Sequence, residues 1–480
     1  MIRSCLLLVP SERKSANQEG ELMQAGVFPP LGLAYIATAL EKAHPDIDIN
    51  IIDALAENLS EDELLVQVEK INPDIIGITV LTQQVEMALS VTRKIKAKNN
   101  QCTIVWGGPH VHFEHEKAIQ NNAVDFCVRG EGEITFAKLI AAINDKTNLR
   151  QVEGITFLDE EGQTIVTPDR PFIQDLDTIG FPARELLNID RYSAPIALKG
   201  RKPFASILAT RGCPFDCHFC SLTKMWQRRQ RRRSVENVLD EIGMLYKTYG
   251  IKSISFVDDL LVLDRKWTLQ LCAGLVKRGL HKKIIWECCG RIRLMTEELL
   301  LAMKKAGCRC VDYGIEFGNQ RILDFVNKGF KIADVHKTVA LTNKVGIPVK
   351  GLFMMGYPTE TKETMQDTID LAKNLKMDYF TVSVAAPYPG TDLYAYCVKH
   401  DLLEKSEWVD LVQLRYAAIK HENFTLDDVI QYTMRLMKAC MLKPSYIMRT
   451  LFNHPAEALR FGPPLLKRLF QNFMVFRSKH

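Results

Sequence analysis

Short apolar runs of strand length alternate with longer segments that carry one apolar face of helical period through most of the chain. In residues 1–145 we predict strands at Cys5–Val9, Asp48–Asp53, Ile75–Leu81, Cys102–Trp106 and Phe126–Val128. The helices predicted between and after them are Leu31–Leu40, Glu61–Glu69, Gln84–Lys98 and a segment that ends at Ile143. Strands and helices that alternate in this way favour a doubly wound, Rossmann-like parallel sheet.

Small residues follow the ends of several of these strands. Ligands of a doubly wound sheet bind where its strands end, and glycines there let a broad ligand lie against the backbone. We therefore expect Gly107, Gly108, Gly130 and Glu131 to line a ligand site, with turn geometry alone as the alternative explanation of the glycines. His110 is expected to be a polar residue at a loop end. The loop after the first strand lacks the G-x-G-x-x-G pattern of a nicotinamide-binding domain, which disfavours that class.

Residues 146–200 are predicted to be a connector with a small hairpin within Gln151–Leu158 and Gln163–Val166. Six further strand–helix units follow in residues 201–396. Their predicted strands are Phe204–Ala209, Ile251–Val257, Ile284–Cys288, Val311–Ile315, Val349–Met354 and Phe380–Val384. Six such units predict a parallel sheet curled into a partial (β/α)6 barrel, similar to a TIM barrel, whose active residues collect at the C-terminal strand ends. Residues 397–480 are predicted to form a helical C-terminal region.

Three cysteines follow the first barrel strand in a C-x3-C-x2-C pattern: Cys213, Cys217 and Cys220. Three thiolates so close together can hold three corners of a 4Fe-4S cluster and leave one iron with an open position, which is typical of a catalytic site. Half a zinc site is the alternative. Zinc modules usually repeat their cysteine pair about 15–20 residues on, whereas the next cysteine here is Cys272.

The cysteine loop, with Phe219 before its last cysteine, resembles the cluster loop of the radical S-adenosylmethionine (SAM) enzymes. The first 145 residues resemble the cobalamin-binding domain that precedes many radical SAM barrels. The segments that carry this second resemblance are Pro29–Leu33, Gly107–His110 and Gly130–Glu133. Over residues 1–395 the chain is therefore similar to a family that includes bacteriochlorophyll, hopanoid and phosphinate methylases and the anaerobic magnesium-protoporphyrin cyclase. The D-x-H-x-x-G motif, which supplies a histidine to cobalt elsewhere, is absent.

The resemblance also implies roles for residues around SAM. Asp258 stands where the family carries an acidic group for the SAM ammonium, although Val257-Asp258-Asp259 replaces the usual Gly-Gly-Glu. Two carboxylate oxygens suit a ribose diol, and a guanidinium suits a carboxylate. The residues assigned to SAM in this way are Phe219 and Gly356 beside the adenine, Glu316 at the ribose or the amino acid moiety, and Arg291 or Arg293 at the carboxylate.

The resemblance implies a cobalamin-dependent radical SAM enzyme that binds a 4Fe-4S cluster, SAM and cobalamin. We expect a C-methyltransferase, in which a deoxyadenosyl radical takes hydrogen from an unactivated carbon and methylcobalamin gives the methyl group. A non-methylating oxidative cyclase or ring-rearranging enzyme is the first alternative, and a cobalamin- or redox-sensing regulator is the second. A methylthiotransferase is disfavoured, because Cys5, Cys102 and Cys127 are too scattered for its extra N-terminal cluster.

Composition limits the cellular compartment and the classes of partner that we expect. Thirteen cysteines, an odd number, do not suggest a disulfide framework, and no run of 18 apolar residues exists, so we expect a cytoplasmic protein. The run Arg228–Arg233 is interpreted as a solvated loop, with one or two arginines reaching SAM or an anionic substrate, rather than as a nucleic-acid patch. A second cluster on Cys288, Cys289, Cys308 and Cys310 is conceivable, but buried core thiols are the commoner case.

The last residues carry the excess positive charge, with seven Lys/Arg and one acid from Lys443 to His480. An apolar stripe between Leu465 and Phe476 has polar and basic residues opposite it. Such a stripe most often packs on its own protein, and it also suits contact with the inner face of a membrane. We expect a small-molecule or isoprenoid-like lipid substrate, and an electron donor such as flavodoxin or ferredoxin.

Overall fold

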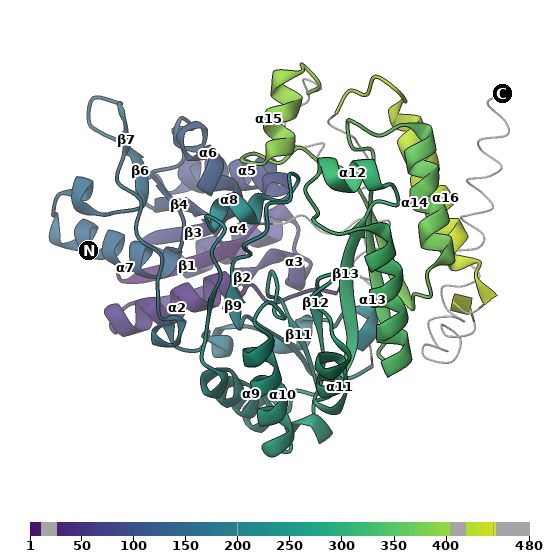
Figure 1. The fold of residues 1–480 in the computed structure, drawn as a ribbon. Helices are drawn as coiled ribbons and strands as arrows, with labels where there is room; N and C mark the ends of the chain where they lie inside the picture. Colours follow the sequence, from purple (N-terminus) through teal and green to yellow (C-terminus); the bar gives the residue numbers. More distant parts are fainter. Residues whose placement is uncertain (11–25, 199, 404–418, 445, 448–480) are drawn as a thin grey trace.

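The computed structural model describes residues 1–10, 26–198, 200–403, 419–444 and 446–447. Two α/β units lie against each other, with the first at the left and the second at the centre and right of Figure 1. A final described helix, α16 (Leu426–Met441), packs beside α14 (Lys362–Asn374) on the second unit. The apolar stripe between Leu465 and Phe476 lies outside the described residues.

The first unit is built on a seven-stranded sheet in the order β2-β1-β3-β4-β5-β6-β7. Its first five strands in sequence pair in parallel, and β6 and β7 add antiparallel to the β5 edge. The strands are β1 Ser4–Val9, β2 Asp48–Asp53, β3 Ile75–Thr79, β4 Thr103–Gly107, β5 Phe126–Val128, β6 Ile155–Leu158 and β7 Thr164–Val166. The hairpin expected in the connector therefore continues the first sheet.

The alternating side chains of β1 explain how this sheet is covered on both faces. Leu6 and Leu8 belong to a core with α4 and α5, whereas Leu7 belongs to a second core with α2 and α7. Because both faces are buried, the strand reads as a continuous apolar run. The helices of this unit are α2 Leu31–Ala43, α3 Ala54–Glu57, α4 Glu61–Ile71, α5 Val85–Lys98, α6 Pro109–Ile119 and α7 Gly132–Asp145.

The second unit is a six-stranded parallel sheet in the order β15-β14-β13-β12-β11-β8. Within this sheet each strand lies beside the next one in sequence, which produces the predicted partial barrel. Its strands are β8 Phe204–Ile207, β11 Ser253–Phe256, β12 Ile285–Gly290, β13 Cys308–Glu316, β14 Val349–Met355 and β15 Tyr379–Val384. Its helices, besides α14 and α16, are α8 Ser221–Met225, α9 Val235–Tyr249, α10 Arg265–Lys277, α11 Glu297–Lys305, α12 Gln320–Phe325, α13 Ile332–Val345 and α15 Asp392–Lys399.

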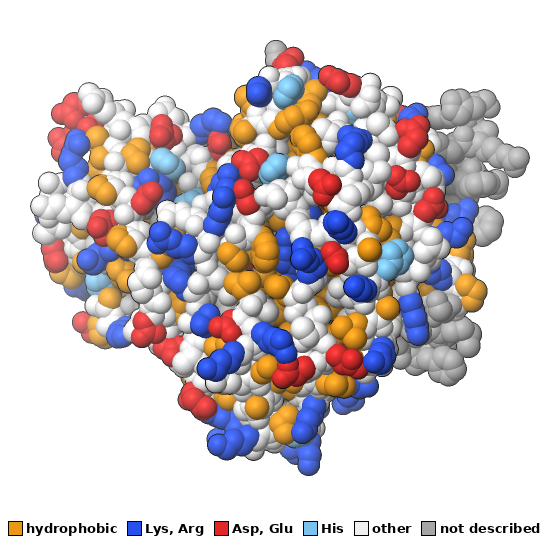
Figure 2. Space-filling model, viewed as in Figure 1, with side chains coloured by type: hydrophobic (Ala, Val, Ile, Leu, Met, Phe, Trp, Pro, Cys, Tyr) orange, Lys and Arg blue, Asp and Glu red, His pale blue; other side chains and the backbone are white. Residues whose placement is uncertain are grey.

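The space-filling view shows Lys/Arg and Asp/Glu side chains mixed over the visible face, and hydrophobic side chains gathered near its centre (Figure 2). Among the helices that the structure describes, none is long and apolar enough to cross a bilayer. The helical prediction was wrong in one place that matters for the site: α6 begins at Pro109, so His110 lies in a first helical turn rather than in a loop.

Candidate active site

The three cysteines of the C-x3-C-x2-C pattern lie on the loop between β9 (Thr210–Arg211) and α8. The loop is internally braced, because the backbone N–H of Cys220 donates to the carbonyl oxygen of Cys217 at 3.0 Å. Burial raises the pKa of the Cys220 thiol to about 11, and it also raises the pKa of Cys213. Partly buried thiols of this kind become thiolates when iron binds them, so the donor set fits a cluster.

Neighbouring segments fix the position of this loop from outside. The backbone N–H of His218 donates to the carbonyl oxygen of Val326 just after α12, and the N–H of Leu393 in α15 donates to the carbonyl oxygen of His218. These bonds measure 3.1 and 2.9 Å. The segment between the second and third cysteines is thus tied to two separate helical elements of the barrel.

Two carboxylates at the end of β11 hold the start of the loop. Asp258 accepts from the backbone N–H groups of Ala209, at 3.0 Å, and Thr210 through one oxygen. Asp259 accepts from the N–H of Gly212 at 2.9 Å. Asp258 is buried, and burial raises its pKa to about 7. Its role in SAM binding stays a prediction, and its visible role is to support the cysteine loop.

Gly212 has a geometric reason to be glycine. Its φ is +95°, and a Cβ there would lie 2.0 Å from the backbone oxygen of Arg229. The chain on either side of α8 therefore approaches closer than any side chain permits.

Glu316 forms an ion pair that the sequence analysis did not anticipate. Its Oε1 lies 2.7 Å from Nζ of Lys328, and both side chains are largely buried. The same ammonium lies 5.2 Å from the ring centroid of Phe219. No local pattern marks Lys328, because α12 separates it from Glu316 in the chain. The pair places the predicted adenine neighbour, the predicted ribose partner and a further cation together beside the cysteine loop.

Arg291 lies against the cysteine loop. Its guanidinium carbon is 3.5 Å from the ring centroid of Phe215, and its Nη1 is 3.9 Å from Sγ of Cys217. Arg293, the alternative, instead points to the surface and donates to the carbonyl oxygen of Gly329 at 3.3 Å. Arg291 is thus the one of the two that is close to the cysteines.

Gly356 follows β14 with a φ of +79°, and a Cβ there would lie 2.9 Å from Cγ1 of Val429 in α16. Its place beside the adenine stays a prediction.

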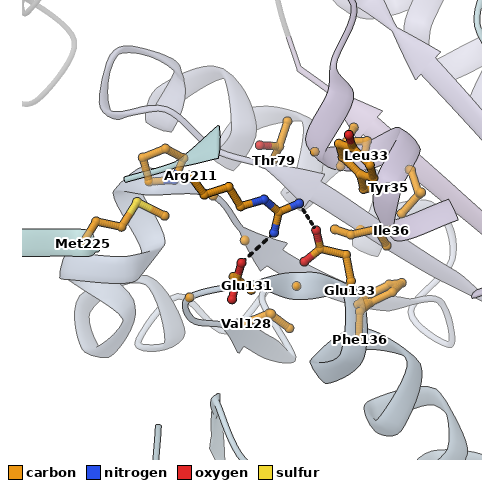
Figure 3. Close-up of a pocket in the computed structure, with 18 of the residues that line it drawn as sticks. Leu33, Tyr35, Ile36, Thr79, Val128, Glu131, Glu133, Phe136, Arg211 and Met225 are labelled. Atoms are coloured by element: carbon orange, nitrogen blue, oxygen red, sulfur yellow. Dashed lines mark hydrogen bonds and ion pairs between the residues drawn. The ribbon is translucent and has the colours of Figure 1, made fainter. Parts of the chain in front are cut away.

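A cavity of about 310 Å³ opens where the strands of the first sheet end (Figure 3). Its lining includes the predicted Gly107, Gly108, Gly130 and Glu131. Leu208, Arg211, Leu222, Met225, Trp226 and Asp259 of the second unit also line it. One cavity therefore touches both the sheet ends and the two elements that flank the cysteine loop, β9 and α8.

The lining suits a broad ligand with an apolar part. Gly108 has a φ of +96°, and a Cβ there would lie 2.9 Å from Oγ1 of Thr79. Gly107 is different, since the nearest heavy atom to an added Cβ would be 3.7 Å away. Its small size leaves open space along the cavity rather than relieving a clash. The deeper lining consists of apolar side chains, including Leu7, Val105 and Phe136. Glycine edges over an apolar floor suit the close approach of one part of a corrin.

His110 is not among the residues that line the cavity. It is buried in α6, with its Nδ1 3.2 Å from Oγ1 of Thr82. Burial lowers the pKa of this imidazole to about 4, so the ring is neutral at physiological pH. Its surroundings are those of a structural histidine.

Charged side chains form the wall between the two units. Arg211 of β9 donates to Glu131 and Glu133 at 2.6 Å each, and all three are buried (Figure 3). Arg231 lies 2.7 Å from the second oxygen of Glu131. The guanidinium of Arg211 also lies over the Tyr35 ring at 5.3 Å. Glu131 is thus an acceptor at the interface as well as a lining residue.

The basic run is only partly solvated, which corrects the expectation of a solvated loop. Arg233 is buried and pairs with Glu241, whose other oxygen lies 2.7 Å from Arg184 of the connector. Arg231 is enclosed at the interface between the units, whereas Arg232 remains exposed. Sequence alone shows a dense positive charge, but it does not show that Glu131 of the first unit and Glu241 of α9 neutralise part of it.

The four barrel cysteines do not share one face. Cys288 and Cys308 belong to the core between the sheet and its helices, whereas Cys289 and Cys310 are absent from that core. Cys288 and Cys289 are neighbours on β12 and point to opposite sides of the sheet. Cys308 and Cys310 are two residues apart on β13, and the register shift between β12 and β13 at this point accounts for their separation. A second cluster on these residues is therefore not supported.

Comparisons with known proteins agree with both halves of the site. Residues 24–140 match the B12 binding domain, and residues 207–372 match the radical SAM superfamily. An uncharacterized methyltransferase of Pyrococcus horikoshii is 35% identical over 427 residues, which are 89% of this chain and 90% of the relative. The anaerobic magnesium-protoporphyrin IX monomethyl ester cyclase of Rubrivivax gelatinosus is 32% identical over 77% of this chain and 66% of its own length.

A solved structure shows the same fold. The radical SAM methyltransferase TsrM of Kitasatospora setae, with cobalamin and a 4Fe-4S cluster bound, has a TM-score of 0.67 and 18% identity over 91% of this chain and 82% of its own. The two matched domains imply a 4Fe-4S cluster, SAM and cobalamin as cofactors. With its cysteine loop and its glycine-edged cavity on one interface, the chain belongs to the B12-binding radical SAM enzymes.

Proposed function

We propose that this enzyme is a C-methyltransferase that methylates an unactivated carbon of a small-molecule substrate. The observation that carries the proposal is the shared cavity, whose lining comes from the glycines of the first unit and from α8 and β9 beside the cysteine loop. A methyl donor held there would lie next to the site where a substrate radical forms. The relative that matches 89% of the chain is described as a methyltransferase, which supports the same reading.

The cofactors supply the chemistry, namely the radical that removes hydrogen and the methyl group that replaces it. The protein's residues supply position and enclosure. Asp258 and Asp259 hold the backbone before the first cysteine, and Arg211 ties the same segment to the first unit. The buried Lys328–Glu316 pair offers a cation and a carboxylate at the barrel end, which suit the charged and hydroxylated parts of SAM.

An oxidative cyclase is the second candidate, because a relative that is 32% identical over 77% of the chain carries that name. Both candidates use the same cofactors and the same radical, so the geometry of the site is compatible with either reaction. They differ in what becomes of the substrate radical. A methyltransferase consumes a second SAM to renew its methyl donor and releases S-adenosylhomocysteine, whereas a cyclase releases deoxyadenosine without it.

The test is therefore an anaerobic reaction of the reconstituted enzyme with candidate substrates and mass spectrometry of both nucleosides. Methyltransfer predicts S-adenosylhomocysteine and deoxyadenosine in equal amounts, with a substrate product heavier by one methyl group. Label from methyl-deuterated SAM should appear in that product. Deoxyadenosine alone, with a product that has lost hydrogen, would favour the cyclase.

The radical step consumes an electron from outside the protein, and we propose flavodoxin or ferredoxin as its source.

We also propose an apolar, isoprenoid-like substrate, in keeping with the basic amphipathic C-terminal segment. Flotation of the full chain and of a chain that lacks 462–480 with anionic liposomes would test contact with a membrane. Equal binding by both would remove the tail from the proposal.

A further inference from the structure

A set of polar side chains lies inside the barrel, away from the cofactor-binding ends. Glu287 of β12 is opposite Cys310 of β13 in the register of the sheet, and Asp312 of β13 is opposite Lys350 of β14. Their neighbours Trp286 and Val311 belong to the core that packs against the outer helices. Because side chains alternate along a strand, the polar set points to the other, concave side of the sheet.

Three of these residues bring possible metal ligands close together. One oxygen each of Glu287 and Asp312 and the sulfur of Cys310 all lie within 4.8 Å of one another, and all three residues are buried. Metal–ligand bonds of about 2.0–2.3 Å place the ligands of one zinc ion about 3.3–3.8 Å apart. Small side-chain rotations bridge the difference. The Sγ of Cys310 is already 3.6 Å from Oδ1 of Asp312.

The set contains one polar atom whose environment is unexplained. Oε1 of Glu287 accepts from the hydroxyl of Ser255 at 3.1 Å, but Oε2 is buried with no hydrogen-bond partner in the part of the chain that the structure describes. Glu287 is only 3% exposed. Buried carboxylate oxygens normally have a partner, so an oxygen without one points to a missing ligand.

Lys350 completes the arrangement. Its Nζ lies 2.8 Å from Oδ2 of Asp312. The Lys350 ammonium thus binds Oδ2 of Asp312 and leaves Oδ1 beside the Cys310 thiol. Residues around a metal site orient its ligands by hydrogen bonds of this kind. Together, an acid, a thiol and a second acid oriented by a lysine form a mixed oxygen–sulfur set, which suits a borderline ion such as zinc.

We propose that Glu287, Cys310 and Asp312 form a binding site for a divalent transition-metal ion of the zinc type, separate from the cluster. Three protein ligands leave a further coordination position for water or for an oxygen of the substrate.

The test uses Co²⁺ as a spectroscopic probe for zinc. The protein is prepared without cobalamin and with Cys213, Cys217 and Cys220 replaced by alanine, so that the cluster cysteines cannot contribute thiolate ligands. We expect one Co²⁺ per chain with a sulfur-to-metal charge-transfer band. Cys310→Ser should abolish the band, and Glu287→Gln should weaken binding at least tenfold. Cys289→Ser is the matched control, because Cys289 lies opposite Asp312 in the register of β12 and β13 but is not in the ligand set.

The outcomes are distinguishable from failure of the methyltransferase proposal, since no turnover is measured. The absence of a band, or a band that survives Cys310→Ser, would overturn the site. If circular dichroism shows that Cys310→Ser is unfolded, the near-isosteric Glu287→Gln decides, and an unchanged dissociation constant would overturn the proposal. Elemental analysis of the full-length enzyme with an intact cluster should show zinc in addition to iron.

Discussion

Arg211 and Glu131 meet at 2.6 Å across the boundary between the two units, although they are 80 residues apart in the chain. Arg211 stands two residues before the first cysteine of the cluster loop, and Glu131 lines the cavity at the end of β5. This buried ion pair, together with Arg211–Glu133 and Arg231–Glu131, therefore links the positions of the two predicted cofactor-binding regions. Any tilt of one unit against the other would separate these charges.

Arg211→Gln should destabilise the protein strongly. The change leaves Glu133 buried without its cation and leaves Glu131 with Arg231 alone. Breaking one side of a buried ion pair costs about 3–5 kcal/mol. The free energy of unfolding, measured in urea, should fall by that order, and cobalamin affinity should fall with it.

Arg278→Gln is the matched control for that change. Arg278 pairs with Glu236 and, at 2.6 Å, with Asp240, but both acids are largely exposed. Exposed pairs contribute about 0–1 kcal/mol. An equal loss of unfolding free energy in the two arginine variants would contradict the claim that the buried pair at the interface stabilises the protein more than an exposed pair does.

Gly108→Ala should disturb the cavity more than Gly107→Ala. At Gly108 the backbone has a φ of +96° and an added Cβ would lie 3.0 Å from the backbone nitrogen of Val80. An ordinary residue in such a conformation costs about 1–3 kcal/mol. At Gly107 an added methyl group meets nothing closer than 3.7 Å.

Urea unfolding should therefore separate the two glycine variants, with Gly107→Ala close to wild type. Cobalamin binding, followed by absorbance, should fall in both, because the methyl group of Gly107→Ala enters the cavity itself. Full cobalamin affinity in Gly107→Ala would contradict the placement of the ligand against this edge.

Each cluster cysteine should be indispensable for iron. Cys217→Ala removes one of three ligands, so iron content and the visible absorption of the reconstituted protein should fall to background. Cys272→Ala provides the control, since Cys272 is a buried thiol of the α10 core and is not in the loop. It should retain a full cluster. Zinc in place of iron in the wild-type protein would contradict the radical SAM assignment of the loop.

Stability should decline as pH rises, in part because of Glu360. This carboxyl is wholly buried, and burial raises its pKa to about 8, although backbone N–H groups of Tyr357 and Gly356 donate to it. An unfolded glutamate titrates near pH 4.3. Between about pH 4.3 and 8 the folded chain keeps a proton that the unfolded chain has lost. The free energy of unfolding then falls with rising pH, by at most about 1.4 kcal/mol per pH unit for one group.

Glu360→Gln should flatten this dependence, because the amide keeps an acceptor oxygen and does not titrate. Urea unfolding at pH 5 and pH 8 measures the difference. Glu363→Gln is the control on the next helix, since Glu363 is fully exposed and its pKa is lowered. Burial also raises the pKa values of Asp258 and Glu287, so part of the decline of unfolding free energy with pH should remain in this variant. An unchanged slope in Glu360→Gln would refute the assignment.

Local pattern was sufficient for the order of the sheet strands and for most of the helices between them, although it missed α6. The strand β2, for example, has the bounds that the sequence predicts, Asp48–Asp53. The three cysteines likewise needed only their spacing. Such features depend on residues within a few positions of one another, where sequence distance and spatial distance agree.

Local pattern failed where partners come from distant segments. The hairpin at residues 155–166 looked like part of a connector because nothing nearby shows that β5 offers it an open edge. Arg231 was expected to be solvated because its partner, Glu131, belongs to the other unit. No sequence motif marked Lys328 as a partner of Glu316.

The sequence by itself thus determined the two-unit architecture, the loop that brings three cysteines together and the glycines at the strand ends. The tertiary structure alone decided which charges neutralise one another, which of Arg291 and Arg293 lies near the cysteines, and that Glu287, Cys310 and Asp312 converge inside the barrel. The reason is physical. Hydrophobic periodicity depends only on residues that are close together in the sequence. The pairing of buried charges depends instead on how strands that are far apart in the chain are brought into register.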